Sequence, residues 1–335
     1  MNYKLFFLAA LCTATLFSCV DQREYENTPQ DNLEALWNII DQHYCFFQYK
    51  QAQYGLDWND VHEKYRVRVS ERMSDKQLFE VMADMLAKLR DGHVNLSYGG
   101  DVARYWTWHE AHPTNLSDTL LRRYLGTDYK IAAGLSYRIL DDHIGYIRYE
   151  SFSSGVGDGN LDEVLAELMT CHGLIIDLRG NGGGNLTYAE TLAARFAQQK
   201  TLVGYMQHKT GTGHDDFSEK EAQWIEPSSR LRWHKPVCVL TNREVYSAAN
   251  EFVKYMKQMP QVAIVGDRTG GGGGLPFSSS LPNGWMVRFS ACPMYDAEGN
   301  HVEFGIAPDV EVGLSQEDLL KGRDTIIETA RRMLR

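Results

Sequence analysis

The chain has 335 residues, of which 43% are hydrophobic, and it carries a formal net charge of −10. This length suffices for one large domain plus a smaller one, each with a proper apolar core. Because the balance of charge is acidic, we expect neither nucleic acid nor an anionic membrane surface to be the main partner.

The N-terminus is predicted to be an export signal. Lys4 precedes an apolar run over residues 5–17, which is too short to span a bilayer and is typical of a signal-peptide core. The tetrapeptide Leu-Phe-Ser-Cys that ends at Cys19 resembles a bacterial lipobox, in which the cysteine is lipidated and becomes the mature N-terminus. An ordinary cleaved secretory signal is the alternative. We therefore expect a lipoprotein signal peptide over residues 1–19, then a polar tether over residues 20–30, with the lipid as the only membrane contact.

A small helical bundle is predicted to follow the tether. Apolar residues recur at helical spacing over residues 33–47, Asp57 can cap a second helix, and Ser74 begins a capping box that opens a third. We place this bundle over residues 31–92. From residue 93 to 335 the pattern changes to alternating strands and helices, which predicts an α/β domain.

A glycine-rich turn lies at the centre of the α/β part. Residues 174–178 form a mainly apolar run typical of a fully buried strand, residues 180–184 read Gly-Asn-Gly-Gly-Gly, and a helix is expected over residues 187–196. Free amides and the positive end of a helix dipole together favour a negatively charged group. A P-loop would need a Lys-Ser/Thr pair after the last glycine, and a dinucleotide fingerprint would need glycine at Asn185. The turn is therefore an oxyanion hole for acyl chemistry or a tight turn without chemistry.

Ser247 is the candidate nucleophile. It lies between an apolar strand at residues 237–241 and a helix at residues 247–256, which is the position of the serine in nucleophile-elbow enzymes, although the Gly-x-Ser-x-Gly motif is missing. Serine is also among the commonest residues at a helix N-cap. Position alone leaves both interpretations open.

Four other segments complete the pattern. The five glycines at 270–274 predict either a mobile wall of a site or a plain linker. Residues 209–233 are polar and are expected to form an exposed excursion, and residues 316–334 a C-terminal amphipathic helix. Residues 101–130, rich in aromatic side chains, could form a lid over a site or a packed loop.

Four segments of the chain form a pattern by their order and spacing. They are Leu89-Arg90-Asp91-Gly92-His93, residues 176–184, residues 241–251 around Ser247, and Gly305-Ile306-Ala307-Pro308-Asp309. Together these segments resemble the tail-specific (C-terminal processing) serine peptidases. The resemblance extends over nearly the whole mature chain, and it implies a crotonase-like spiral of ββα units, shared with the Clp protease, behind the small helical bundle.

The resemblance distinguishes two catalytic designs. In one, a lysine activates the serine, but the equivalent position here is Gly272, so that dyad is missing. In the tricorn-core branch, the histidine of the Asp-Gly-His segment works with a carboxylate near the C-terminal motif, and this chain offers His93 and Glu303. The chain also departs from the processing enzymes because residues 97–135 leave no room for a PDZ domain.

The resemblance thus implies that Ser247 is the nucleophile, His93 the base, and Glu303 the group that orients the imidazole. The amides of Gly183 and Ala248 would hold the oxyanion. No metal or organic cofactor is expected. The glycines expected to contact substrate are Gly182, Gly184, Gly271 and Gly272.

The leading hypothesis is a lipid-anchored serine endopeptidase, periplasmic or surface-facing, that acts on peptides or unfolded proteins in the bacterial cell envelope. One alternative is a non-catalytic lipoprotein that uses the same cleft to bind an apolar ligand or a peptide. A crotonase-type acyl-CoA enzyme is disfavoured because acyl-CoA is cytosolic and the chain carries an export signal.

Overall fold

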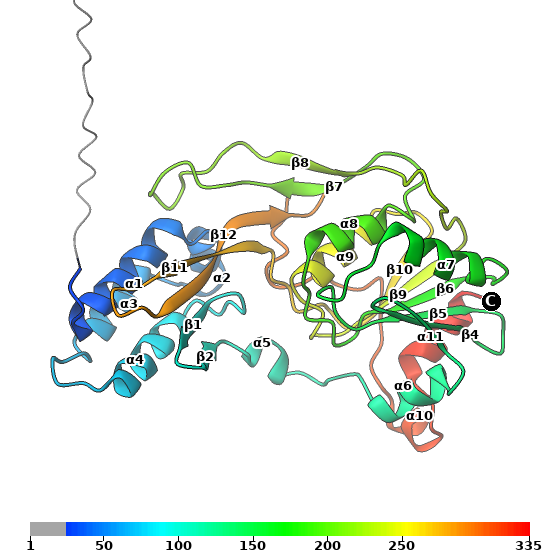
Figure 1. Cartoon of the computed structure of the whole chain (residues 1–335), viewed down its shortest axis with the longest axis horizontal. Helices are drawn as coiled ribbons and strands as arrows, with labels where there is room; N and C mark the ends of the chain where they lie inside the picture. The colour runs from blue at the N-terminus through cyan, green and yellow to red at the C-terminus, as the bar shows by residue number, and fades with distance from the viewer. Residues whose placement is uncertain (1–24) are drawn as a thin grey trace, which may run out of the picture.

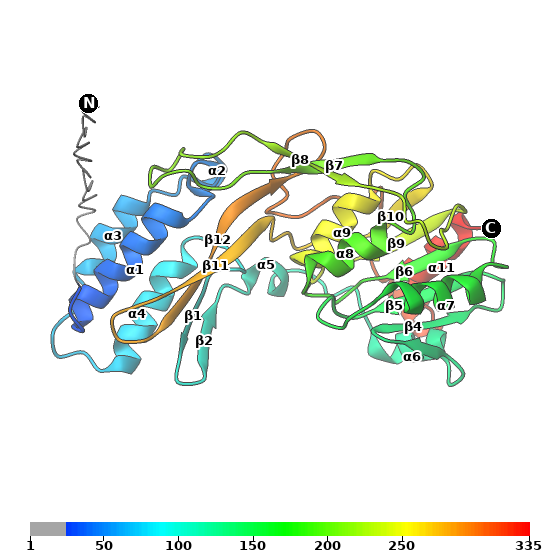
Figure 2. The ribbon, with the colours of Figure 1, turned by 45° about the horizontal axis from the view of Figure 1, so that its top comes forward.

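A computed structural model describes residues 25–335 as two β-sheets with helices packed around them (Figure 1). The predicted signal peptide, including Cys19, lies outside the described residues. The N-terminal helices lie at one end of the molecule and the α/β core at the other, and a six-stranded sheet lies between them (Figure 2). Within residues 25–335, no helix combines the length and the apolar character needed to cross a bilayer.

The N-terminal bundle has four helices where three were expected. The backbone turns to an extended conformation at Tyr44, so the first predicted helix ends there and a separate helix begins at Phe47. The caps are as predicted: the Asp57 carboxylate accepts from two backbone amides, and Ser74 forms its capping box with Gln77. The helices are α1 (Pro29–His43), α2 (Phe47–Tyr54), α3 (Trp58–Arg66) and α4 (Asp75–Ala87).

The bundle packs on a sheet of order β2-β1-β12-β7-β8, with β11 paired to β12. Leu96, Val287 and Phe289 from this sheet belong to the same buried core as the helices. The core therefore does not divide at the predicted boundary between residues 92 and 93. The strands are β1 (Asn95–Tyr98), β2 (Asp101–Arg104), β7 (Thr201–Met206), β8 (Glu221–Ile225), β11 (Gly274–Ser280) and β12 (Met286–Tyr295).

The second sheet has the order β13-β10-β9-β6-β5-β4-β3, and its strands β5, β6, β9, β10 and β13 are parallel. Its parallel strands are buried, with α7, α8 and α9 in the core on one face and α11 on the other. The predicted α/β fold is confirmed. The strands are β3 (Lys130–Ala132), β4 (Leu135–Ile139), β5 (Gly145–Tyr149), β6 (Leu174–Asp177), β9 (Val237–Thr241), β10 (Val262–Gly266) and β13 (Val310–Glu311); the helices are α7 (Asp158–Leu168), α8 (Leu186–Ala193) and α9 (Ala248–Met256).

Two sequence-based expectations need correction. The polar segment at 209–233 contains β8, which pairs antiparallel with β7. The C-terminal helix is interrupted at Gly322, whose φ of 67° ends α10 (Gln316–Leu320) before α11 (Thr325–Met333) begins. Residues 101–130 contain β2, α5 (Thr107–Glu110) and α6 (Asp118–Leu125), and they run from the first sheet to the second (Figure 1).

Candidate active site

Ser247 lies between β9 and α9, at the N-cap position of that helix. Its backbone has φ 56° and ψ −125°, a conformation that a residue with a side chain adopts only under strain. The hydroxyl makes no capping hydrogen bond, and its Oγ lies 2.9 Å from Nε2 of His93. Helix capping therefore does not explain this serine.

His93 is held by the turn that precedes β1. Its backbone N–H donates to Oδ1 of Asp91 at 2.7 Å, and its ring packs edge-on against Tyr246, with centroids 5.0 Å apart. The residue is only 3% exposed. Backbone and ring are both fixed, so the imidazole is already directed at Ser247.

The environment keeps the His93 imidazole neutral. Burial lowers the pKa of His93 to about 4; the carboxylate of Asp91 opposes this, and the guanidinium groups of Arg288 and Arg104 add to it. The ring atom Nδ1 has no hydrogen-bond partner within residues 25–335. A neutral ring with Nδ1 protonated leaves Nε2 free to accept the Ser247 proton.

Glu303 does not make the expected hydrogen bond to His93. Its Oε1 accepts from Nζ of Lys50 at 2.9 Å, and its Oε2 accepts from the amide of Gly273 at 3.2 Å. Glu303 is thus close to the site but is engaged by a lysine of α2. The expected contact with His93 is replaced by an ion pair, because Lys50, 253 positions away in the sequence, reaches this carboxylate.

Lys50 and Asp91 form the rest of a buried polar cluster beside His93. Nζ of Lys50 donates to the backbone oxygen of Leu89 at 2.7 Å and lies 3.7 Å from Oδ2 of Asp91. That same oxygen accepts from the hydroxyls of Tyr44 and Ser290, both at 2.9 Å. Sequence reasoning missed both charged residues. Asp91 lies inside the Asp-Gly-His segment, which was the available signal for it, whereas nothing in the local sequence marks Lys50.

The cluster has one more carboxyl group than cations. Burial, followed by the negative charge of Asp91, raises the pKa of Glu303 to about 8 despite the contact with Lys50. Burial opposes ionisation of Asp91 too, but Lys50 and the hydrogen-bond donors around Asp91 keep its pKa below the usual value. The lowered pKa of Asp91 and the raised pKa of Glu303 therefore place the negative charge of the cluster on Asp91 before Glu303.

The glycine-rich turn at residues 180–184, called the first glycine loop below, lies directly against the nucleophile Ser247. A Cβ added to Gly183 would come within 2.8 Å of Cβ of Ser247 and 2.9 Å of the amide nitrogen of Ala248. The Ala248 N–H has no acceptor within the described chain, whereas the Gly183 N–H donates to Oδ1 of Asn181 at 3.0 Å. Of the two expected oxyanion donors, only Ala248 is free in this state. Gly182 and Gly184 are exposed beside them.

The second glycine loop is neither a mobile wall nor a linker. Gly271 and Gly272 are buried; the carbonyl of Gly271 accepts from the amide of Ser247 at 2.8 Å, and the Gly272 N–H donates to the carbonyl of Glu303 at 3.0 Å. A Cβ on Gly272 would meet the Tyr246 ring at 2.6 Å. The loop of these two glycines therefore packs against the backbone of Ser247. Because both glycines are buried, little of their surface remains for the expected contact with substrate.

Trp108 of α5 covers the other side of Tyr246. The two rings stack with centroids 4.5 Å apart, and a Cβ on Gly270 would lie only 2.0 Å from the indole. The segment at 101–130 is therefore packed against the residue that precedes Ser247. This contact supports the packed-loop interpretation at Trp108.

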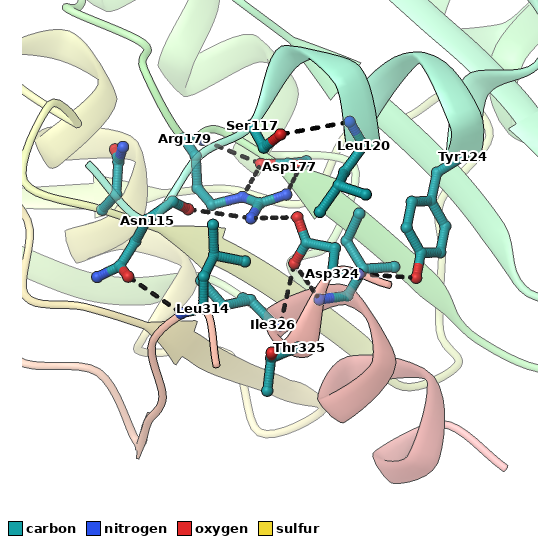
Figure 3. A network of polar contacts seen from close by, with 12 residues as sticks. Asn115, Ser117, Leu120, Tyr124, Asp177, Arg179, Leu314, Asp324, Thr325 and Ile326 are labelled. Atoms are coloured by element: carbon teal, nitrogen blue, oxygen red, sulfur yellow. Dashed lines mark hydrogen bonds and ion pairs between the residues drawn. The ribbon is translucent and has the colours of Figure 1, made fainter. Parts of the chain in front are cut away.

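Asp177 and Arg179, the charged residues just before the first glycine loop, form an ion-pair network within the protein (Figure 3). Arg179 donates to both carboxylate oxygens of Asp177 and, through Nη1, to Oδ2 of Asp324 at 2.9 Å. Burial would raise the pKa of Asp177, but the charge of Arg179 outweighs it and leaves the value at about 2. Asp324 caps α11, so this ion-pair network joins the end of β6 to the C-terminal helix. Within the described chain, no three His, Cys, Asp or Glu side chains gather as a metal site would require.

Comparison with known proteins agrees with this arrangement. The family model of peptidase family S41 matches residues 143–312, just over half of the chain. The chain belongs to peptidase family S41. A model of the tricorn protease C1 domain matches residues 25–87, which confirms the resemblance to the tail-specific peptidases and their tricorn-like branch.

Individual relatives place the chain within this family. Carboxy-terminal processing protease CtpA of Bacillus subtilis is 27% identical over 176 residues, which are 52% of this chain and 36% of that protein's length. The crystal structure of a candidate peptidase from Parabacteroides merdae is 52% identical, with a TM-score of 0.88 over 92% of this chain and 97% of that one. Mature CPAF, at 13% identity, has the same fold, with a TM-score of 0.71 over 92% of this chain and 96% of its own.

Proposed function

We propose that the protein is a serine endopeptidase that hydrolyses peptide bonds in peptides or unfolded proteins. Ser247 is the nucleophile and His93 its base. The observation that carries this proposal is the 2.9 Å contact between Oγ and Nε2, at a serine whose strained backbone frees the hydroxyl from capping.

The reaction follows from the positions of these groups. As Oγ attacks the substrate carbonyl, its proton passes to Nε2 of His93, which then returns it to the leaving amine. The amide of Ala248 donates to the oxyanion. Gly183 joins it once the substrate oxygen displaces Oδ1 of Asn181, and each such donor is worth roughly 10²–10³ in rate. The buried cluster of Lys50, Asp91 and Glu303 holds the backbone of His93 and the loop that carries Gly273.

We further propose that the protein acts in the bacterial cell envelope and is anchored through lipidated Cys19, with no cofactor. The support is the lipobox-like tetrapeptide after a short apolar run. Cys19→Ala should block lipidation and release the protein from the membrane fraction. Unchanged membrane retention and unchanged gel mobility of that variant would exclude the anchor.

A fluorophosphonate probe tests the enzymatic proposal, because it reacts only with an activated serine. The folded wild type should be labelled at Ser247, located by mass spectrometry of the tryptic peptides, and Ser247→Ala should not be labelled. Absence of labelling in a folded wild-type sample would favour the non-catalytic binder that uses the same cleft.

A further inference from the structure

The segment that follows β2 runs from the first sheet to the second (Figure 1) and is anchored at its two ends. At its near end β2 pairs with β1, and at its far end the carbonyl oxygen of Thr114 accepts from Nδ2 of Asn242 at 2.7 Å. Within residues 25–335, no hydrogen bond joins residues 106–113 to any other part of the chain. Between its anchors, the segment therefore depends on the packing of its side chains.

Trp108 is the residue of this segment that packs deepest. Its indole stacks on the Tyr246 ring, with centroids 4.5 Å apart and an interplanar angle of 24°. Two glycines make room for it: a Cβ on Gly92 would lie 2.8 Å from Nε1, and a Cβ on Gly270 would lie 2.0 Å from Cζ3. Real Cβ atoms do not approach another atom within 3.0 Å. The indole therefore fits only because both positions are glycine.

The three residues that contact the indole adjoin the candidate nucleophile and base. Gly92 directly precedes His93 in the chain. Tyr246 directly precedes Ser247. The residue after Gly270 accepts the Ser247 N–H through its carbonyl oxygen, at 2.8 Å. The indole thus rests on the backbone that carries both reacting groups.

The Tyr246 side chain connects these two groups. Its hydroxyl donates to Oδ1 of Asp91 at 3.5 Å, and the same oxygen accepts the His93 N–H at 2.7 Å. Its ring packs edge-on against the imidazole of His93, with centroids 5.0 Å apart. A shift of Tyr246 would therefore move the nucleophile on the next residue and loosen the packing of the base.

Ser247 needs such support because its backbone is strained. A residue with a side chain keeps a φ of 56° and a ψ of −125° only where its surroundings leave no alternative. Backbone hydrogen bonds fix the amides of Tyr246 and Ser247. They do not fix the Tyr246 ring, which is held by close packing against Gly272 and by the stack with Trp108. The indole thus completes the support of the strained conformation.

We propose that Trp108 is a positioning residue, whose indole locks Tyr246 and thereby holds Oγ of Ser247 at reacting distance from Nε2 of His93 before substrate binds. The inference rests on the proposed peptidase function and adds a residue to it. A mutation away from the chemistry that misplaces reacting atoms by about 1 Å can cost roughly 10² in rate. Since Trp108 acts through Tyr246, its removal should lower kcat and leave KM nearly unchanged.

Kinetics of a variant without the indole test the proposal. Trp108→Ala should lower kcat for one peptide about 10- to 100-fold and leave KM within about threefold of wild type. A small fluorophosphonate gives the same comparison without a peptide. Its rate constant of inactivation at saturation should fall by the same factor, with its half-saturating concentration nearly unchanged. A raised KM for the peptide with unchanged fluorophosphonate kinetics would show that Trp108 contacts substrate instead, and would overturn the proposal.

Matched variants separate the stack from the folding of the segment. Trp108→Phe keeps an aromatic ring against Tyr246 and should recover most of the lost kcat. Trp106→Ala removes an exposed indole of the same segment, one that packs on Arg104 and His109, and should keep kcat within about twofold of wild type. Thermal unfolding checks that each variant is folded, and Trp108→Leu replaces Trp108→Ala if the latter is not. An equal loss in Trp106→Ala, or no recovery in Trp108→Phe, would overturn the proposal.

The same assays separate this proposal from the peptidase function. A folded wild type that neither cleaves peptides nor reacts with fluorophosphonate would reject the peptidase function, and the positioning role with it. If wild type does both, and kcat and the rate constant of inactivation are unchanged in Trp108→Ala, the positioning role is rejected and the peptidase function stands.

Discussion

Nζ of Lys50 lies 2.9 Å from Oε1 of Glu303, across 253 positions of sequence, and both side chains are buried. A helix of the N-terminal bundle is thereby joined to the loop that packs behind the candidate nucleophile. Within residues 25–335, Lys50 is the only cation that forms an ion pair with Asp91 or Glu303. The bundle is therefore part of the candidate active site rather than an accessory to it.

Removing the amino group of Lys50 should lower the free energy of unfolding. Lys50→Met leaves two buried carboxyl groups without a positive partner, and breaking a buried pair from one side typically destabilises a protein by about 3–5 kcal/mol. Urea unfolding should show this loss, and Lys50→Met combined with Glu303→Gln should recover part of it. Lys76→Met, on the exposed side of α4, is the control and should change stability by less than about 0.5 kcal/mol. A Lys50→Met protein as stable as the control would contradict the ion-pair assignment.

Glu303 should make stability depend on pH in a defined window. The pKa of Glu303 is about 8 in the folded protein and near 4.5 when unfolded, so the folded state binds its proton more tightly. The stabilisation is fully present below pH 4.5 and is lost as the pH rises through 8. Glu303→Gln cannot ionise, so the Tm of this variant relative to wild type should rise by several degrees between pH 5 and pH 9. A Tm difference that stays constant or falls would show that Glu303 is ionised throughout.

The pH profile of catalysis should be displaced toward acid. Burial lowers the pKa of His93 to about 4, so the neutral imidazole that accepts the Ser247 proton persists to unusually low pH. At pH 5, kcat/KM should retain about nine-tenths of its plateau, whereas a base with the ordinary histidine pKa of about 6.5 would retain only about 3%. Initial rates from pH 4.5 to 8 on one peptide distinguish the two. An activity that rises only above pH 8 would instead point to a lysine base.

Ser247→Ala and His93→Ala should be equally damaging. The two groups act as one unit, so each single variant should lose about 10⁴–10⁶ in kcat. Lys254, the nearest lysine along α9, is occupied because its Nζ lies 2.5 Å from Oε2 of Glu251 and 3.0 Å from Oε1 of Gln223. Steady-state assays of Ser247→Ala and His93→Ala on one peptide measure this loss in kcat. Substantial hydrolysis by His93→Ala would remove the histidine mechanism and leave the serine nucleophile.

Gly272 should not accept the lysine of the other catalytic design. Its φ is +79°, and any Cβ would lie 2.6 Å from the Tyr246 ring. Gly272→Lys and Gly272→Ala should therefore both displace Tyr246, the neighbour of Ser247, and lower kcat/KM more than tenfold together with Tm. Gly159→Ala is the control, because nothing lies within 4 Å of its added Cβ in α7; it should be neutral or stabilising. A fully active Gly272→Ala would show that this close packing does not support the site.

Short-range chemistry allowed much of the fold to be predicted from the sequence. The caps at Asp57 and Ser74, and the position of Ser247 between a buried strand and a helix, depend on residues within a few positions of one another. The pairing of His93 with Ser247 was implied by the family resemblance, and the structure brings these two residues together. The same local reasoning failed at residues 44 and 322, where a single backbone conformation interrupts a continuous apolar pattern.

The sequence by itself determined the fold class, the family and the candidate nucleophile and base. Only the tertiary structure decided which group Glu303 contacts and which glycines are buried. Contacts of this kind join segments as far apart as the 253 positions between Lys50 and Glu303, and they depend on strand register and helix packing. A periodic pattern tells which face of an element is buried, but it does not tell which distant side chain shares that buried space.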